Sequence, residues 1–365
     1  PNAPVSVDPW EANQAGSIAD VILNHGGDPN VLRPYYDTKD GGKSWRAFRP
    51  KRTGRRRDDG SMIYNEVPTS NATTTLRKDD WKLLDQVVIK AAKERLKAWA
   101  DLVGAGLTFG GFDGMGKTVL EHETQSDIND AILSMDGLNQ GRADRPEYNL
   151  VSLPLPIVHK DFHFSARQIA TSRNSSTPLD TSMAELAARK VAEMVEKLLL
   201  GVAASYSFGG GTIYGYTNYP NRLTKSLTAP TGTNHEVTVR EVLQMKQQAY
   251  GAFHYGPYFC YCSPGWDEFM DDDYSVNKGA NTLRDRIAQI EGVDRPVTLD
   301  FLPDTTLLLV QKTTNVVRAV TGMNIQTIQW PTQGGMQLNY KVMGILVPEL
   351  RADHYNKTGI VHGSV

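Results

Sequence analysis

Residues 179–201 read LDTSMAELAARKVAEMVEKLLLG and carry the strongest helix signal in the chain. Asp180 and Thr181 open the segment, and Ser182 and Glu185 stand three residues apart, which is the spacing of a capping box. Apolar residues then recur every three or four positions, so they share one side of a helix of about five turns. This apolar stripe comprises Met183, Leu186, Ala187, Val191, Met194, Val195, Leu198, Leu199 and Val202. The segment therefore predicts a long helix that is buried on one side and charged on the other.

A second amphipathic helix is predicted upstream, with Asp79 or Asp80 as its N-cap. Its apolar residues follow the same spacing and stop before Gly104 and Gly106. They are Trp81, Leu84, Val88, Ala92, Leu96, Trp99 and Val103. We expect one continuous helix here.

Between the two helices, residues 119–147 are polar and mixed, whereas residues 150–169 alternate apolar and polar side chains. Alternation with a period of two predicts a long β-strand. Pro154 and Pro156 remove two backbone donors from it, so we expect the strand at a sheet edge or in a projecting hairpin.

Short helices and strands alternate after the long helix. We expect helices at residues 239–252, 266–270 and 283–289, and strands at 258–262 and 305–311. Two further strands, near residues 325–330 and 337–347, are expected to return and pair with the main body.

Residues 1–77 are rich in Pro, Gly, Asn, Asp and Thr and show no sustained helix or strand period, which predicts an extended arm. A basic cluster interrupted by Trp45 and Phe48 lies within this arm. It comprises Lys43, Arg46, Arg49, Lys51, Arg52, Arg55, Arg56 and Arg57. Two interpretations stay open: the arginines grip nucleic-acid phosphates while the aromatic rings stack on bases, or the arm docks on acidic neighbouring protein.

The composition excludes several classes of protein. A formal net charge of -2 on 365 residues gives no overall attraction to nucleic acid or membranes, so such binding must come from local clusters. Cys260 and Cys262 are the only cysteines, which excludes a disulfide framework and a Cys-rich zinc module, and we expect both to be buried on one face of a strand. No run of about 18 to 20 apolar residues occurs, and residues 1–10 (PNAPVSVDPW) do not resemble a signal peptide. We therefore expect a soluble intracellular protein.

Residues 111–118, GFDGMGKT, match the P-loop pattern letter for letter. A working P-loop needs a strand leading in and a helix leading out, because the helix N-terminus and backbone amides cradle the phosphates. Here a helix precedes the motif, and Glu121 and Glu123 would lie near the phosphates. No later strand ends in an aspartate placed to hold magnesium. We therefore predict a glycine-rich turn.

His159, Asp161 and His163 share one face of the predicted strand, where three such ligands can hold zinc or nickel. The polar face of a strand at an oligomer seam gives the same pattern, and we favour that interpretation. Residues 271–273, all aspartate, lack the spaced oxygens and the glycine of a calcium loop. No nucleophile elbow or other catalytic set is evident, so we expect no metal, no cofactor and no enzymatic activity.

From about residue 75 to the C-terminus, the motifs resemble those of the encapsulins. Residues 75–85 (TLRKDDWKLLD) resemble the N-terminal helix of that family, and its members also carry a glycine-rich turn where this chain has residues 110–116. LPLPI at 153–157 and FHF at 162–164 are similar to the end of the family's projecting loop.

The resemblance continues downstream. Residues 179–186 (LDTSMAEL) and 188–193 (ARKVAE) are similar to the spine helix of the encapsulins. Residues 255–259 (YGPYF), with Trp266, resemble a strand and short helix of their apical domain. The agreement in spacing is stronger than the identity.

Encapsulins share the Hong Kong 97-type capsid fold with the major capsid proteins of tailed bacteriophages. The resemblance therefore implies an α+β, Hong Kong 97-like capsid fold with a peripheral domain, an apical domain, an extended loop and an N-terminal arm. The implied boundaries are 1–77 for the arm, 78–118 for the N-terminal helix and glycine turn, 119–175 for the extended loop, 176–215 for the peripheral domain with its spine helix, 216–315 for the apical domain and 316–365 for the C-terminal strands of the peripheral domain.

The resemblance also implies a function. It predicts a structural subunit whose loop and arm lie across neighbours, so that pentamers and hexamers close into an icosahedral shell. Because encapsulins lack the basic arm, we favour a bacteriophage major capsid protein that encloses double-stranded DNA over an encapsulin-type nanocompartment that encloses a cargo enzyme. A P-loop nucleotide-binding protein is the third alternative.

The expected partners are copies of the chain, phage DNA and possible decoration, portal or scaffolding proteins, with no membrane. The expected location is the virion capsid, after assembly in the host cytoplasm. The expected nucleic-acid contacts are Arg46, Arg49, Lys51, Arg52, Arg55, Arg56 and Arg57.

Overall fold

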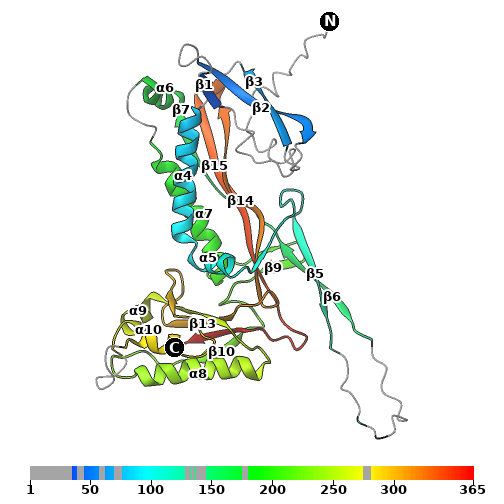
Figure 1. Cartoon of the computed structure of the whole chain (residues 1–365), viewed down its shortest axis with the longest axis vertical. Coiled ribbons are helices and arrows are strands. Elements are labelled where there is room, and N and C mark those ends of the chain that lie inside the picture. The colour runs from blue at the N-terminus through cyan, green and yellow to red at the C-terminus, as the bar shows by residue number, and fades with distance from the viewer. Residues whose placement is uncertain are drawn as a thin grey trace.

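The computed structural model describes residues 35–38, 45–56, 62–69, 76–127, 133, 135, 145–174, 180–273 and 281–365. Figure 1 shows an upper part in which long helices lie along long strands, a lower part of mixed helices and strands, and a two-stranded hairpin that projects away from both. Among the described residues, no helix is long and apolar enough to cross a membrane.

A four-stranded sheet forms the upper part, in the order β4-β14-β15-β7. Its strands are β4 (Thr108–Phe109), β7 (Val158–Ser165), β14 (Val317–Thr332) and β15 (Gln337–Leu350). β14 and β15 are antiparallel partners, which confirms the two returning strands predicted for the tail. The Phe162 ring stacks on Tyr340 at 5.2 Å between centroids, and Trp81 meets Tyr340 edge-on at 5.9 Å. These rings join the sheet to the helix that carries Trp81.

The predicted long helix is α7 (Ser182–Leu200), and it ends at Gly201, whose φ of 80° is left-handed. The predicted capping box does not form. Instead, the Asp180 carboxylate accepts a hydrogen bond from the Ser182 backbone N–H at 3.0 Å.

The buried face of α7 confirms the predicted stripe in part: Ala187, Val191, Val195, Leu198 and Leu199 are buried. Its centre is a row of fully buried alanines, Ala184, Ala188 and Ala192. The larger Met183, Leu186 and Met194 are each almost half exposed. The reason is that α4 packs against α7, and small side chains let two helix backbones approach closely.

The single helix predicted upstream is in fact two, α4 (Lys78–Arg95) and α5 (Lys97–Gly104), separated at Leu96. Glu196 of α7 explains the break, because its carboxylate accepts backbone hydrogen bonds from Ala98 at 2.7 Å and Trp99 at 3.3 Å. These donors are among the N–H groups that a new helix start leaves unsatisfied. The N-cap of α4 is Arg77, so the predicted N-caps Asp79 and Asp80 lie in its first turn.

The lower part contains a five-stranded sheet in the order β10-β16-β13-β11-β12. Its strands are β10 (Leu223–Ser226), β11 (Tyr258–Cys262), β12 (Val297–Thr298), β13 (Thr306–Gln311) and β16 (Ile360–Ser364). β11 and β13 confirm two predicted strands. β16 corrects the expectation that all of residues 316–365 belong with the upper sheet, since it pairs with β10 and β13 in the lower one.

Three helices pack around this lower sheet, and all three were predicted. They are α8 (His235–Gly251), α9 (Pro264–Met270) and α10 (Leu283–Ala288). Cys260 and Cys262 are free thiols buried on the face that packs against α8, as expected. Phe259 and Tyr261 point to the opposite face, where they meet residues of α5, α7 and β14. One hydrophobic core therefore joins the upper and lower parts.

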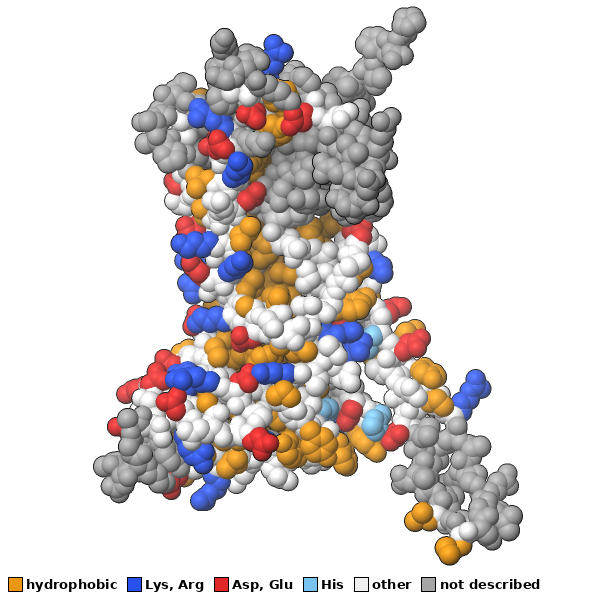
Figure 2. Space-filling view, in the orientation of Figure 1, with side chains coloured by type: hydrophobic (Ala, Val, Ile, Leu, Met, Phe, Trp, Pro, Cys, Tyr) orange, Lys and Arg blue, Asp and Glu red, His pale blue; other side chains and the backbone are white. Residues whose placement is uncertain are grey.

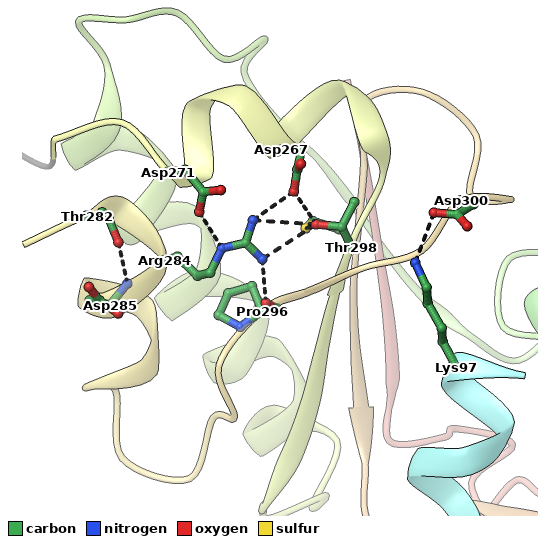
Figure 3. A network of polar contacts seen from close by, with 10 residues as sticks. Lys97, Asp267, Asp271, Thr282, Arg284, Asp285, Pro296, Thr298 and Asp300 are labelled. Atoms are coloured by element: carbon green, nitrogen blue, oxygen red, sulfur yellow. Dashed lines mark hydrogen bonds and ion pairs between the residues drawn. The ribbon is translucent and has the colours of Figure 1, made fainter. Parts of the chain in front are cut away.

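Arg284 of α10 ties the short helices to the sheet (Figure 3). Its guanidinium donates to the Asp271 carboxylate at 2.7 Å, to Asp267 at 2.8 Å and to the Pro296 carbonyl at 2.8 Å. The Thr298 hydroxyl donates to Asp267 as well. This network holds α9, α10 and β12 together, because one planar guanidinium engages all three elements.

The projecting hairpin consists of β5 (Val119–Gln125) and β6 (Tyr148–Pro154), paired antiparallel. The prediction of one long strand over 150–169 was wrong. The hairpin ends at Pro154, β7 begins at Val158, and α6 (Ala166–Asn174) follows directly. β7 and α6 thus lie outside the projecting element, although the predicted extended loop ran to residue 175. Two smaller strands, β8 (Tyr206–Phe208) and β9 (Gly211–Ile213), and a 3-10 turn, η1 (Gln333–Gly335), complete the fold.

The N-terminal segment is not simply an extended arm. It contains a three-stranded antiparallel sheet in the order β1-β2-β3. The strands are β1 (Tyr35–Thr38), β2 (Trp45–Arg56) and β3 (Met62–Thr69). Sequence periodicity missed them because Pro, Gly and charged residues interrupt the alternation of apolar side chains.

Candidate intersubunit and nucleic-acid surfaces

The basic cluster of the sequence lies on β2, a central strand, rather than on an irregular arm. Its described members are Arg46, Arg49, Lys51, Arg52, Arg55 and Arg56, while Lys43 and Arg57 lie outside the described residues. Arg46 is exposed and opposite Asp37 of β1. Strand pairing fixes the spacing of the backbone positions that carry these cations.

Trp45 and Phe48 were both considered as rings that stack on bases, and for Phe48 this interpretation is wrong. Phe48 is buried, with its ring centroid 6.0 Å from that of Tyr35. A ring packed inside the small sheet cannot offer its face to a base.

The β5–β6 hairpin exposes apolar side chains. Tyr148, Leu150 and Val151 of β6 are 61%, 66% and 43% exposed. Glu121 and Glu123 of β5 are exposed beside them. Figure 2 shows hydrophobic and acidic side chains together along the projecting element. Tyr148 and Leu150 lie on one face of β6, and Val151 lies on the other. A monomer gains nothing by leaving these large apolar side chains in water, so the hairpin is suited to contact with another chain.

A groove of about 610 Å³ lies beside the C-terminal half of α7, next to residues 156–160 and 203–206. Ile157, Met194 and Tyr206 line it and are each 40–47% exposed. Its charged lining is mainly basic and consists of Lys160, Lys190 and Lys197, with His159 and Glu193. The groove is therefore apolar and positive, whereas the described strands of the hairpin are apolar and mainly negative.

A buried ion network anchors the base of the hairpin. Glu349 of β15 is 1% exposed and binds the Arg318 guanidinium through two hydrogen bonds of 2.9 Å. Arg351 Nε lies 3.0 Å from the Glu349 carboxylate, and His122 Nδ1 of β5 also lies 3.0 Å from it. Burial raises the pKa of Glu349, but His122 and the charges of Arg351 and Arg318 outweigh it and bring the pKa to about 2.

The glycine-rich segment at 111–118 lacks the surroundings of a P-loop. β4 precedes it, but β5 follows it, so no helix N-terminus faces the segment. Gly114 instead donates to the Gly322 carbonyl at 3.2 Å, and a Cβ on Gly114 would meet Gly322 Cα at 2.6 Å. The segment is a turn, as predicted, and it packs backbone against backbone on β14.

His159, Asp161 and His163 lie on exposed positions of β7, as the strand pattern predicted. Asp161 contacts Lys341 at 3.4 Å and His159 at 3.7 Å. Among the residues that the structure describes, no group of three or more His, Cys, Asp or Glu could hold a metal ion.

A family model described as a family of unknown function (DUF6260) matches residues 71–363. The chain belongs to this family. The match covers the two sheets, the long helices and the hairpin, and it begins after β3.

Solved structures resemble this chain over most of its length. A virus-like particle from Pyrococcus furiosus matches with a TM-score of 0.55 and 14% identity over 78% of this chain and 99% of that one. The capsid of Myoviridae phage XM1 matches with a TM-score of 0.55 and 10% identity over 72% and 90%. Mycobacterium phage Bobi matches with a TM-score of 0.50 and 13% identity over 71% and 89%.

These likenesses confirm the predicted fold. The neighbours are Hong Kong 97-like capsid proteins, and this DUF6260 chain has the same α+β fold. Sequence identities of 14% or less show a shared fold and not a shared function.

Sequence patterns did not reveal two sets of residues in this DUF6260 chain: the Glu349 network and the Glu196 cap. Both depend on contacts between residues far apart in the chain, such as His122 with Glu349 and Ala98 with Glu196. A partial signal exists, since Glu196 interrupts the apolar run that ends α7 and Glu349 lies within an apolar strand. A charge at a buried position of such a pattern indicates a specific partner.

Proposed function

We propose that this chain is a structural subunit that assembles into a closed icosahedral shell, and that it is the major capsid protein of a bacteriophage. The observation that carries the proposal is the projecting hairpin, whose Tyr148, Leu150 and Val151 have no cover among the described residues of the same chain. A side chain that is exposed in the monomer and apolar is stabilised by contact with a neighbouring copy.

The groove beside α7 supplies a matching surface on that neighbour. Lys160 and Lys190 of the groove complement Glu121 and Glu123 of the hairpin, and both surfaces are apolar at their centres. Complementary charge steers the encounter and fixes the register, while the apolar contact supplies most of the affinity. A contact between two different surfaces of the chain is heterologous, and its repetition through a rotation that closes generates rings rather than dimers.

The proposed contents of the shell are double-stranded phage DNA. The support is the density of cations on β2, since Arg and Lys on adjacent backbone positions neutralise phosphates without reading the sequence. In this proposal, copies of the chain form pentamers and hexamers, the protein is located in the virion capsid, and portal, scaffolding or decoration proteins complete the particle.

A nanocompartment that encloses a cargo enzyme is the second candidate. The virus-like particle from Pyrococcus furiosus matches this chain as well by TM-score as the phage XM1 capsid does, and over 99% of its own length. The contents of the purified particle separate the two candidates. A P-loop nucleotide-binding protein is no longer proposed, because a strand follows the glycine turn.

The hairpin contact is tested with Leu150→Asp, which places a charge on the face of β6 that also carries the exposed Tyr148. Sedimentation velocity should show large particles for the parent and subunits or small oligomers for Leu150→Asp. Leu150→Met is the matched control and should still form particles, because it keeps an apolar side chain of similar volume. If the parent, Leu150→Asp and Leu150→Met all form particles equally well, the hairpin is not part of the interface between subunits.

A further inference from the structure

A group of exposed aromatic side chains lies just beyond the C-terminal end of α8. Phe253, Tyr255 and Tyr355 are 69%, 56% and 55% exposed, and we call them the aromatic patch. The ring centroids of Phe253 and Tyr355 are 6.3 Å apart. Figure 2 shows hydrophobic side chains gathered at the lower edge of the molecule, on the side of the projecting element. Large apolar side chains that cluster on a surface indicate a contact site.

The backbone of Phe253 is strained. Its φ of 61° lies in the left-handed region, which is unfavourable for a residue with a Cβ and which glycine adopts freely. Burial returns little of this cost, because most of the ring is exposed. The fold alone therefore favours glycine at position 253. A strained residue that the core does not need indicates a functional role.

Hydrogen bonds hold the two turns of the aromatic patch in place. The Gln311 amide donates to the Tyr255 carbonyl at 2.6 Å, and its oxygen lies 2.9 Å from His254 Nδ1. The Asp353 carboxylate accepts a hydrogen bond from the backbone N–H of Tyr355 at 3.0 Å. His254 Nε2 lies 3.6 Å from Asp353, which joins the two turns. The patch is thus preorganised, and this lowers the entropy cost of binding a partner.

The aromatic patch lies directly beside the hairpin. The Tyr355 hydroxyl donates to the carboxylate of Asp127, two residues after β5, at 3.1 Å. A copy of the chain that is seated on the outer part of the hairpin therefore lies close to the patch.

The size of a stable contact also calls for more surface than the hairpin offers. A specific protein–protein contact buries about 800 Å² on each partner. The three exposed apolar side chains of β6 supply less than this, since even a buried aromatic side chain contributes only about 150–250 Å². The aromatic patch adds apolar surface next to them.

We propose that the aromatic patch is a second contact with another copy of this chain, next to the hairpin contact, and that Phe253 is its anchor. Aromatic side chains in preorganised surfaces supply a large share of the free energy of association. This explains why a strained phenylalanine occupies a position where the fold favours glycine. The inference rests on the proposed function and extends it to a second surface.

Phe253→Gly separates a role in folding from a role in contact. Glycine relieves the left-handed strain, so the melting temperature of the dissociated chain should stay the same or rise. The protein concentration needed for half-maximal assembly, measured by sedimentation velocity, should rise at least about tenfold. Phe253→Tyr keeps the ring and should assemble like the parent.

A matched control relieves the same kind of strain without removing a ring. Gln333 is exposed in the turn between β14 and β15 and has a φ of 52°. Gln333→Gly should therefore leave assembly unchanged. Phe253→Asn is a second variant, because asparagine tolerates the left-handed conformation, and it should impair assembly as the glycine variant does.

Amide hydrogen exchange reports the contact directly. Amides of residues 253–256 and 353–357 should exchange more slowly in particles than in dissociated subunits. Equal exchange in the two forms, or normal assembly of both Phe253→Gly and Phe253→Asn, would overturn the contact. If Leu150→Asp blocks assembly while both Phe253 variants assemble normally, the patch contact is wrong and the proposed function stands. If the parent forms no particles under any condition, the proposed function fails and the patch contact fails with it.

Discussion

Glu196 is a carboxyl group buried where α5, α7 and the lower sheet meet. Burial raises its pKa to about 7, and the hydrogen bonds from the Ala98 and Trp99 amides only partly offset this. Asp101 lies near enough to raise it further, and the hydroxyl of Tyr216 is buried in the same region. The break between α4 and α5 is thus built on a group that gains or loses a proton near neutral pH.

The pKa of Glu196 predicts how stability depends on pH. The folded chain keeps this proton up to about pH 7, whereas the unfolded chain loses it near 4.5. The contribution of Glu196 to the free energy of unfolding is therefore fully present below pH 4.5 and is lost as pH rises to about 7. The total loss is on the order of 3 kcal/mol at most. Chemical denaturation of the dissociated chain between about pH 4.5 and pH 8 should show this decline in the free energy of unfolding.

Glu196→Gln should remove most of the decline, because the amide does not ionise. Glu193→Gln, three residues earlier on α7, is the control: ion pairs with Lys190 and Arg189 lower the pKa of Glu193 despite burial, so its loss should leave the decline in place. A Glu196→Gln chain with the same pH dependence as the parent would show that the carboxyl is not buried as described.

At the scale of elements, sequence patterns located most helices but not their packing. The limits of α7 and α9 were predicted within a few residues, because caps, glycines and periodicity are local signals. The buried face of α7 was predicted only in part, since hydropathy favours Met183 over Ala184 for burial while close packing on α4 favours the alanine.

The hairpin shows why other elements escaped prediction. β5 reads VLEHETQ and carries exposed or half-buried side chains on both faces, so it lacks the apolar alternation of a strand packed on a core. β6 and β7 were joined into one strand because alternation continues through Pro156, although the chain leaves one sheet and enters another there. Pairing partners, which local sequence does not encode, decide such boundaries.

The packing of the glycine turn on β14 predicts an asymmetry between two glycines. Gly114→Ala should destabilise the chain by about 1–3 kcal/mol, because its Cβ would overlap the Gly322 backbone and the turn would have to move. Gly104→Ala, at the end of α5, meets no atom within 4 Å and should be neutral or slightly stabilising. Thermal denaturation distinguishes the two variants, and equal melting temperatures would contradict the close approach of the turn to β14.

At the scale of the whole molecule, one core joins the long sheet to the lower sheet, while the hairpin and the N-terminal sheet extend outward (Figure 1). The motifs that resemble those of the encapsulins implied the Hong Kong 97-like fold, and the structure confirms it. The basic cluster was also identified from sequence, but its location on a β-strand was not, and its role as a nucleic-acid contact stays a prediction.

The basic strand predicts how the contents of the particle depend on charge. Changing Arg55, Arg56 and Arg57 together to alanine should reduce the nucleic acid retained after nuclease treatment while particles still form. The triple lysine variant keeps the charge and should retain nearly as much, because phosphate neutralisation dominates such binding. If the alanine variant and the parent retain equal amounts of nucleic acid, this segment does not contact the genome.

The central claim is that copies of this chain assemble into a closed shell. Electron microscopy of the purified chain across a range of salt concentrations tests it most directly, because the expected object is visible without labels. The account predicts closed particles of uniform size with icosahedral symmetry. A monodisperse monomer at every salt and protein concentration would contradict it.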